Sequence, residues 1–170
     1  MSSLAALERR IAELEDRAAI TDLLHRTAEL VRAGRMSDGI GLFTPDAVWE
    51  LHHLDPARPG DSTLQRRFEG AEAILGGFAE NAEDGTQVWP MIHNLRIELD
   101  GDEARSTSVI FVAVWPHGRQ LVGEYRDRFR RSEAGWRFAA RTYLLFGDLE
   151  GRYAAETQRD YPALAGTPRD

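Results

Sequence analysis

His93 is the residue of this sequence with the clearest potential for acid–base chemistry. It lies in residues 91–99, MIHNLRIEL, where alternating apolar and polar side chains predict a β-strand. Strict alternation places His93 on the apolar face, together with Leu95, Ile97 and Leu99. A single histidine there is either a packed core residue or a titratable group that lines a cavity and acts as a general base. The sequence leaves both interpretations open.

Asp127 is the second titratable residue on an apolar strand face. Residues 120–131 alternate cleanly, so Tyr125 and Asp127 share one face, and Arg141 falls on the strand that follows. A buried charge is costly unless it is paired or used. Asp127 and Arg141 therefore form either a structural ion pair or a site whose carboxylate faces a ligand. In a catalytic site we predict His93 as the base, with Asp127 or Tyr125 as its partner.

The composition excludes several other kinds of chemistry. The 170 residues contain no cysteine and no lysine, so disulfides, thiolate metal sites and Schiff-base lysines cannot occur. The five histidines do not show metal-ligand spacing, and there is no glycine-rich phosphate loop, so we expect neither a metal nor a cofactor. A net charge of −7 argues against nucleic-acid binding. Without a membrane-length apolar run or a signal-peptide pattern, a cytoplasmic protein is expected.

The pattern of elements predicts an α+β domain. Amphipathic spacing predicts a surface helix from residue 4, a restart or kink at Asp16, and a second helix that ends at Gly34. The remaining predicted elements are a short helix (36–43), a strand (47–53), a loop (54–65), a helix (68–82) and a meander of four strands (91–99, 104–115, 120–131 and 136–146). Asp100-Gly101 marks the first hairpin of this meander.

We expect a curved, mixed or antiparallel sheet that forms a cone, closed by the N-terminal helices around a cavity. The predicted organisation is a helical extension (1–14), one domain (15–147) and a tail (148–170).

Six stretches of the chain, in this order and spacing, resemble the SnoaL-like group of the NTF2-like superfamily. They are RAAITDLL (17–24), FTPDAVW (43–49), FEGAEAI (68–74), NLRIELDGD (94–102), GEYRD (123–127) and GWRF (135–138). The resemblance implies a cone-shaped α+β fold and a homodimer or higher homo-oligomer. It also implies a cavity for cofactor-free acid–base chemistry on a small hydrophobic molecule, as in scytalone dehydratase, polyketide cyclases, steroid isomerases, epoxide hydrolases and a dehydrochlorinase.

The chain departs from this group at the expected catalytic positions. Several catalytic relatives carry a tyrosine and an aspartate late in the long helix, where this chain has Thr27 and Arg32. Pro90 stands where the dehydratase and dehydrochlorinase relatives carry a histidine, so His93 substitutes for it only if the preceding loop is shorter. The residues expected to contact a substrate are Trp49, Thr27, Leu24, Phe111 and Arg141.

Three functions follow from these observations. The first is a cofactor-independent lyase or isomerase that removes a proton next to a carbonyl or a leaving group. The second is a non-catalytic protein that uses the same cone to bind a small ligand or to dimerise. The third is a structural partner resembling an oxygenase β-subunit. The departures at Thr27, Arg32 and Pro90 favour the second function, whereas His93 and Asp127 favour the first.

Overall fold

The computed structural model describes residues 3–54, 60–82, 87–115 and 119–148. Its elements are α1 (Ser3–Arg32), η1 (Met36–Leu42), β1 (Phe43–Leu54), β2 (Ser62–Glu69), α2 (Ala71–Ala82), β3 (Gln87–Asp100), β4 (Glu103–Trp115), β5 (Arg119–Ser132) and β6 (Gly135–Asp148). The strands form one six-stranded sheet in the order β2-β1-β6-β5-β4-β3. β1 and β6 run parallel, and the other neighbouring strands run antiparallel.

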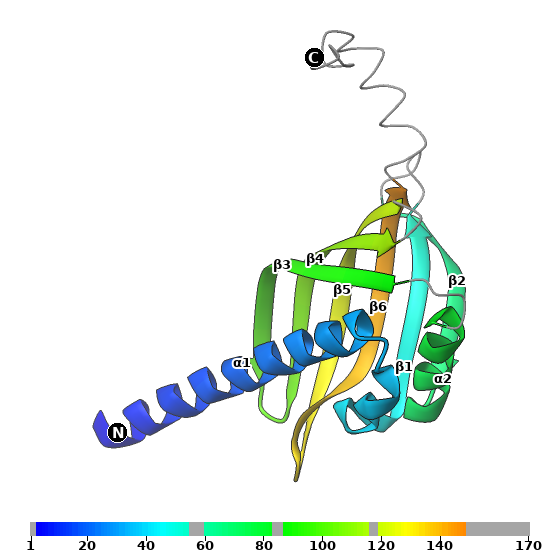
Figure 1. Ribbon diagram of the computed structural model, residues 1–170. Helices are drawn as coiled ribbons and strands as arrows, with labels where there is room; N and C mark the ends of the chain where they lie inside the picture. Colours follow the sequence, from blue (N-terminus) through cyan, green and yellow to red (C-terminus); the bar gives the residue numbers. More distant parts are fainter. Residues whose placement is uncertain (1–2, 55–59, 83–86, 116–118, 149–170) are drawn as a thin grey trace, which may run out of the picture.

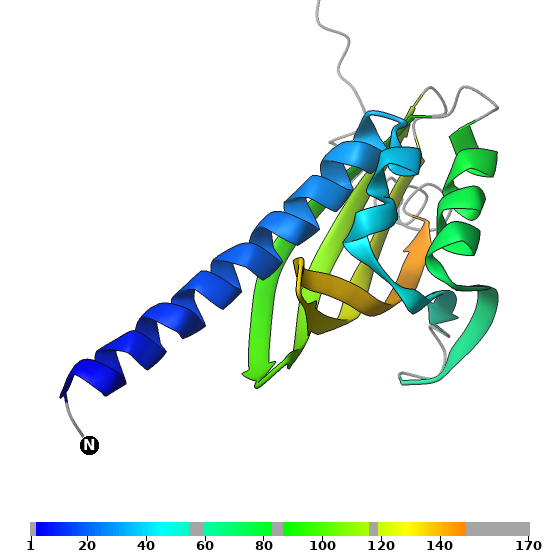
Figure 2. The ribbon, with the colours of Figure 1, turned by 90° about the horizontal axis from the view of Figure 1, so that it is seen from below.

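Both α-helices cover the same face of this curved sheet (Figures 1 and 2). We call the face that α1 and α2 cover the inner face, and the opposite one the outer face. The predicted α+β architecture with a mixed sheet is thereby confirmed.

α1 is one continuous helix of 30 residues, so the predicted restart or kink at Asp16 was wrong. The Asp16 carboxylate accepts hydrogen bonds from the Arg131 guanidinium and, at 3.0 Å, from Nε1 of Trp136. The hairpin between β5 and β6 thus satisfies this polar side chain, and the helix continues past it. The second half of α1 buries its apolar side against the sheet with Ile20, Leu23, Leu24 and Thr27.

β2 is a strand where the sequence predicts the end of a loop and the start of a helix. It pairs with β1, which places Phe68 opposite Trp49 and Arg67 opposite Glu50. Hydrogen bonding to the longer β1 overrides the weak local preference of these residues, a common outcome for strands. α2 consequently begins at Ala71, directly after Gly70, whose φ of 87° is in the left-handed region. Of the predicted tail, residues 149–170 lie outside the described residues.

A β-bulge in β3 changes the face on which His93 lies. His93 pairs with Val109 and Arg96 pairs with Thr107, so Asn94 and Leu95 together oppose the single residue Ser108. Asn94 takes up the extra residue with a φ of 52°, which asparagine tolerates better than most residues. The bulge reverses the alternation, and His93 is therefore exposed on the outer face. The prediction that it shares a face with Leu95, Ile97 and Leu99 was wrong.

The buried apolar side chains form two neighbouring clusters on the inner face. The larger one joins α1, η1 and α2 to the sheet, and its most buried large members are Ile20, Leu24, Ile74, Phe129 and Phe138. The smaller one contains Ile110, Val112 and Tyr143. Trp49 and Ile92 pack against both clusters. Polar residues that lie where the two clusters meet are consequently removed from solvent.

Candidate functional site

Strand register brings the polar inner-face residues together in two adjacent rows. Ser106, Asp127, Arg141 and Trp49 pair across β4, β5, β6 and β1, and we call them the ion-pair row. Ser108, Tyr125, Tyr143 and Leu51 pair across the same strands, and we call them the hydroxyl row. Three of the predicted site residues, Tyr125, Asp127 and Arg141, therefore lie side by side.

A buried ion pair forms the centre of the first row. Nε of Arg141 donates to Oδ1 of Asp127 at 2.7 Å, and Nη2 donates to Oδ2 at 2.9 Å. The Ser106 hydroxyl approaches Oδ2 at a longer 3.4 Å. Because both of its oxygens are engaged, the carboxylate holds the guanidinium in place. The sequence-based alternative of an Asp127–Arg141 ion pair is thus what the structure shows.

Aromatic rings enclose the guanidinium of Arg141. Its Cζ lies 4.1 Å from the ring centroid of Tyr125 and 4.4 Å from that of Phe138. A guanidinium is attracted to aromatic faces, most strongly when it is desolvated. Burial by itself lowers the pKa of Arg141, but the charge and hydrogen bonds of Asp127 more than offset this and raise it. Arg141 is therefore a fixed positive charge inside the protein.

The hydroxyl row contains two buried oxygens without a hydrogen-bond partner. Ser108 is only 2% exposed and Tyr143 8% exposed, yet neither Ser108 Oγ nor Tyr143 Oη has a partner among the described residues. Buried polar groups nearly always have one, so such groups need an explanation. These two hydroxyls belong to the same row and flank Tyr125. They can donate to an acceptor oxygen that is brought to the inner face.

The tyrosines of this row are held in their protonated form. Burial raises the pKa of Tyr125, and the nearby Arg141 only partly opposes this effect. Burial also raises the pKa of Tyr143, with a further contribution from Tyr125. The two rings meet edge to face, with their centroids 5.1 Å apart. Both hydroxyls are therefore donors, and neither is a base, near neutral pH.

Gly123 makes room for the Tyr143 ring. A Cβ at this position would lie 2.3 Å from the carbonyl oxygen of Leu144 and 2.5 Å from a ring carbon of Tyr143. No side chain fits between these groups, so glycine allows the Tyr143 ring to lie against β5.

Trp49 forms an aromatic wall beside the two rows. Its ring centroid lies 5.7 Å from that of Phe68 and 5.9 Å from that of Phe78 on α2. The indole is half-buried and belongs to the packing of both core clusters. The structure therefore gives Trp49 a core role on the inner face, next to the ion-pair row.

The other residues predicted for the site are divided between the two faces. Leu24 is fully buried in the core, and the Thr27 hydroxyl donates to the Leu23 carbonyl of its own helix at 2.8 Å. Phe111 pairs with Met91, which places it on the outer face with His93. The structure thus brings neither His93 nor Phe111 to the two inner rows. Arg32 is exposed near the end of α1, and Pro90 is half-buried in β3.

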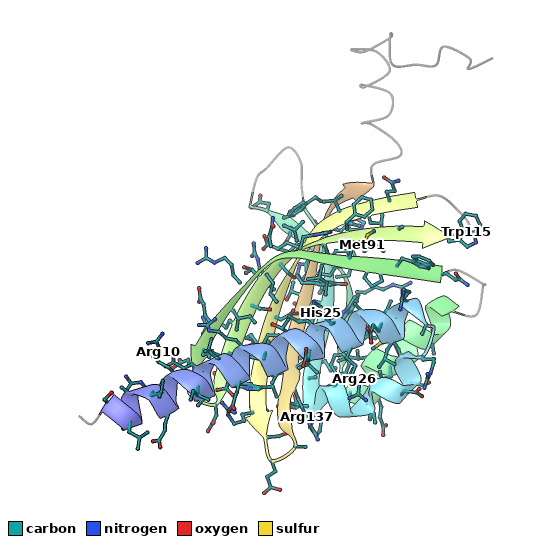
Figure 3. All side chains as sticks on the ribbon, turned by 60° about the vertical axis from the view of Figure 1, so that its left-hand side comes forward. Arg10, His25, Arg26, Met91, Trp115 and Arg137 are labelled. Carbon is teal, nitrogen blue, oxygen red and sulfur yellow. The ribbon has the colours of Figure 1, made fainter. Side chains whose placement is uncertain are left out.

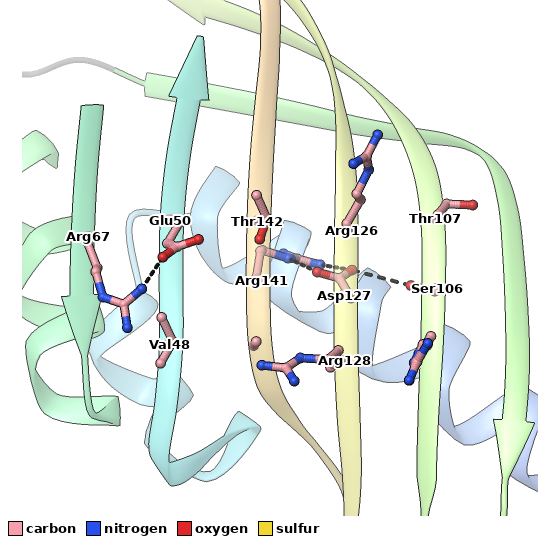
Figure 4. Close-up of a pocket in the computed structure, with 12 residues that line it drawn as sticks. Val48, Glu50, Arg67, Ser106, Thr107, Arg126, Asp127, Arg128, Arg141 and Thr142 are labelled. Carbon is pink, nitrogen blue, oxygen red and sulfur yellow. Dashed lines mark hydrogen bonds and ion pairs between the residues drawn. The ribbon is translucent and has the colours of Figure 1, made fainter. Parts of the chain in front are cut away.

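A groove of about 480 Å³ lies on the outer face, on the opposite side of the strands from the Asp127 and Arg141 side chains. Figure 4 shows it with the helices behind the strands. The side chains on its outer-face lining include those of Arg67, Arg105, Arg126 and Arg128 and the carboxylate of Glu50. Asp127 and Arg141 also line it, through strand positions whose side chains lie on the inner face. Arg67 forms an ion pair with Glu50. Arg105 of β4 lies directly opposite Arg128 of β5, and neither has an ion-pair partner among the described residues. Such a lining can hold a carboxylate or phosphate.

A polar cluster near this groove and the two free hydroxyls were not predicted from the sequence. His52 Nε2 lies 3.2 Å from Glu50 Oε2 on the outer face. The i, i+2 spacing of Glu50 and His52 on one strand was a usable signal for their proximity. Ser108 and Tyr143 could have been found only from the register of β4, β5 and β6.

Within residues 3–54, 60–82, 87–115 and 119–148, no group of three or more histidine, aspartate or glutamate side chains could hold a metal ion. In the same ranges, no helix is both long and apolar enough to cross a membrane.

Comparisons with known proteins agree with this architecture. Uncharacterized proteins of Mycobacterium bovis and Mycobacterium tuberculosis are 29% identical over 136 residues, covering 77% of this chain and 86% of theirs. An NTF2-like protein with a cystatin-like fold from Novosphingobium aromaticivorans is 25% identical, with a TM-score of 0.64 over 92% of this chain and 97% of that one. A hexachlorocyclohexane dehydrochlorinase is 17% identical, with a TM-score of 0.64 over 82% and 90% of the two chains, and shares the fold. The sequence pattern of the SnoaL-like domain matches residues 12–142, and the chain belongs to this family.

Proposed function

We propose that this protein is a cofactor-independent lyase or isomerase that acts on a small hydrophobic molecule at the hydroxyl row. The observation that carries the proposal is the pair of buried hydroxyls, Ser108 Oγ and Tyr143 Oη, that have no partner among the described residues. A ligand with a carbonyl or hydroxyl oxygen would satisfy both of them, while its apolar part contacts the aromatic wall around Trp49.

The chemistry of the row suits the stabilisation of negative charge on a ligand oxygen. When a water molecule or hydroxide ion takes the proton from the carbon next to a carbonyl, negative charge develops on the carbonyl oxygen. Protonated Tyr143 and Tyr125 would donate to that oxygen, and the fixed charge of Arg141, 4.1 Å from the Tyr125 ring, would favour the charged state. Asp127 acts here as a positioning residue for Arg141. His93 has no part in this proposal, because its side chain lies on the other face.

A non-catalytic ligand-binding protein is the second candidate, and one observation favours it. The two rows contain a single carboxylate and no imidazole, and that carboxylate is bound at both oxygens by Arg141 and approached by Ser106. A general base must be able to accept a proton from the substrate. Without such a base, the same hydroxyls would bind a ligand and leave it unchanged.

A panel of small hydrophobic ketones and alkyl halides separates these functions when turnover and ligand-induced shifts in Tm are both measured. The test variants are Tyr143→Phe and Ser108→Ala. Thr107→Ala is the control, since its side chain lies on the outer face of the same strand. For an enzyme we expect turnover by the wild type and a loss of about 100-fold or more in kcat for Tyr143→Phe.

For a binding protein we expect a Tm shift without turnover, and the shift should disappear in Tyr143→Phe. Ligand effects that are equal in all three variants, or the lack of any ligand effect across the panel, would contradict the assignment of the site to the hydroxyl row.

A further inference from the structure

The first half of α1 carries an apolar stripe that is largely exposed in the described part of the chain. Leu7 is 53% exposed, Ile11 47% and Leu14 65%, and Leu4 continues the same stripe. Residues 3–15, which we call the projecting segment, extend beyond the edge of the sheet (Figures 1 and 2). Contiguous exposed apolar side chains often mark an interaction surface, whereas single exposed apolar residues are common on any protein.

The stripe lies on the opposite side of α1 from the residues that pack on the sheet. At 100° per residue, the mean directions of the stripe and of Ile20, Leu23, Leu24 and Thr27 differ by about 170°. Because α1 is one straight rod that the sheet holds by its second half, the stripe cannot turn onto its own domain. The described part of the domain leaves Leu7, Ile11 and Leu14 exposed, so a second copy of the chain can pack against them.

The spacing of the stripe is that of a two-stranded coiled coil. Leu4, Leu7, Ile11 and Leu14 follow one another at intervals of three, four and three residues, which are the a and d positions of a heptad repeat. In a parallel coiled coil, Ile11 at an a position with Leu7 and Leu14 at d positions favours two strands. The repeat weakens to Ala18 and Thr21 where α1 reaches the domain, so the apolar seam is confined to the projecting segment.

The charges beside the seam favour a second copy in the parallel orientation. Glu8 and Glu15 occupy the e positions, and Arg10 and Arg17 occupy the g positions. In a parallel pair, Arg10 of one copy faces Glu15 of the other, which is an attractive contact. An antiparallel pair would place arginine against arginine and glutamate against glutamate. The Arg10 side chain projects freely from this part of the helix (Figure 3).

We propose that the projecting segment pairs with the same segment of a second copy as a parallel two-stranded coiled coil. The two sheets lie on opposite sides of the helix pair, because the seam faces away from each domain. The inner-face rows stay within each copy, so this inference does not depend on the proposed function.

Disulfide trapping tests the geometry directly, since the chain contains no cysteine of its own. Leu14→Cys places the only thiol on the seam, where a parallel in-register pair brings the two Cα atoms within the roughly 4.4–6.8 Å of a disulfide. Arg9→Cys is the control, because residue 9 lies on the side of the helix opposite the seam. We expect mild oxidation to link Leu14→Cys into covalent dimers and to leave Arg9→Cys monomeric. Equal linking of both variants, or none of Leu14→Cys, would overturn the proposal.

Sedimentation equilibrium at micromolar concentration tests the energetics. Ile11→Glu places a charge in the seam, and Ala12→Glu places the same charge one residue away, outside it. We expect the dimer Kd to rise at least about thirtyfold for Ile11→Glu, the effect of losing a well-buried apolar anchor, and to change little for Ala12→Glu. Unchanged thermal unfolding of both variants would show that the domain is intact. A monomeric wild type, or a dimer that tolerates Ile11→Glu, would refute the coiled coil.

Discussion

Arg141 and Asp127 meet through two parallel hydrogen bonds of 2.7 and 2.9 Å, with Tyr125 and Phe138 packed on the guanidinium. Both side chains are buried, so each charge is stabilised by the opposite charge of the other side chain. The pair also holds the guanidinium against Tyr125, a member of the hydroxyl row. Its removal should therefore affect both the stability of the fold and the candidate site.

The first prediction concerns the removal of one member of this pair. We expect Arg141→Met or Asp127→Asn to lower the free energy of unfolding by about 3–5 kcal/mol, because either change leaves a buried charge or polar group unpaired. The double variant Arg141→Met with Asp127→Leu should recover much of the loss. Urea unfolding measures all three, with the exposed Arg128→Met as a control within about 0.5 kcal/mol of wild type. If the single variants lost less unfolding free energy than the control, the ion pair would not be desolvated.

The second prediction concerns stability at alkaline pH. Burial raises the pKa of Tyr125 and Tyr143, so the folded protein keeps both hydroxyls protonated while the tyrosines of the unfolded chain ionise. The contribution of these two tyrosines to the free energy of unfolding is complete below about pH 10. It is lost as the pH rises above that value, at about 1.4 kcal/mol per pH unit for each tyrosine. The free energy of unfolding of Tyr143→Phe should therefore fall less steeply with rising pH than that of the wild type. Urea unfolding between pH 8 and 11 tests this, and equal slopes for both proteins would contradict it.

The third prediction concerns the bulge at Asn94. Its φ of 52° should accept glycine at little cost, because glycine adopts this conformation readily. Asn94→Val should lower the free energy of unfolding by about 1–2 kcal/mol, since a β-branched side chain is strained there. Chemical unfolding of the two variants provides the comparison. If valine were tolerated as well as glycine, β3 would have to run without this bulge, and His93 could then lie on the inner face.

The fourth prediction compares two neighbouring glycines of α2. A Cβ at Gly76 meets nothing within 4 Å, so Gly76→Ala should stabilise the helix by about 0.5–1 kcal/mol. A Cβ at Gly77 would lie 2.4 Å from Cζ of Phe68, so Gly77→Ala should destabilise the protein by about 1–3 kcal/mol. It should also displace Phe68 from the Trp49 ring, which tryptophan fluorescence can detect. Equal effects of both substitutions would contradict the close packing of α2 on β2.

The meander and its polar residues could be predicted because their signals are local. The alternation of residues 120–131 placed Tyr125 and Asp127 on one face, and the register of β5 confirms it. Asp100-Gly101 identified the first hairpin, where Gly101 has a φ of 60°. Turn chemistry and the two-residue period of a strand are properties of short segments, so the sequence alone determines them.

The composition of the candidate site was decided by contacts between distant segments. The parallel pairing of β1 with β6 brings Trp49 beside Arg141, and β2 forms only because β1 offers it hydrogen bonds. The bulge at Asn94 moves His93 to the outer face, and strand register aligns Ser108 with Tyr125 and Tyr143. The sequence by itself thus determined the strands of the meander and which of their residues are polar. Only the tertiary structure decided which of them meet, because one extra residue in a strand reverses every side chain that follows it.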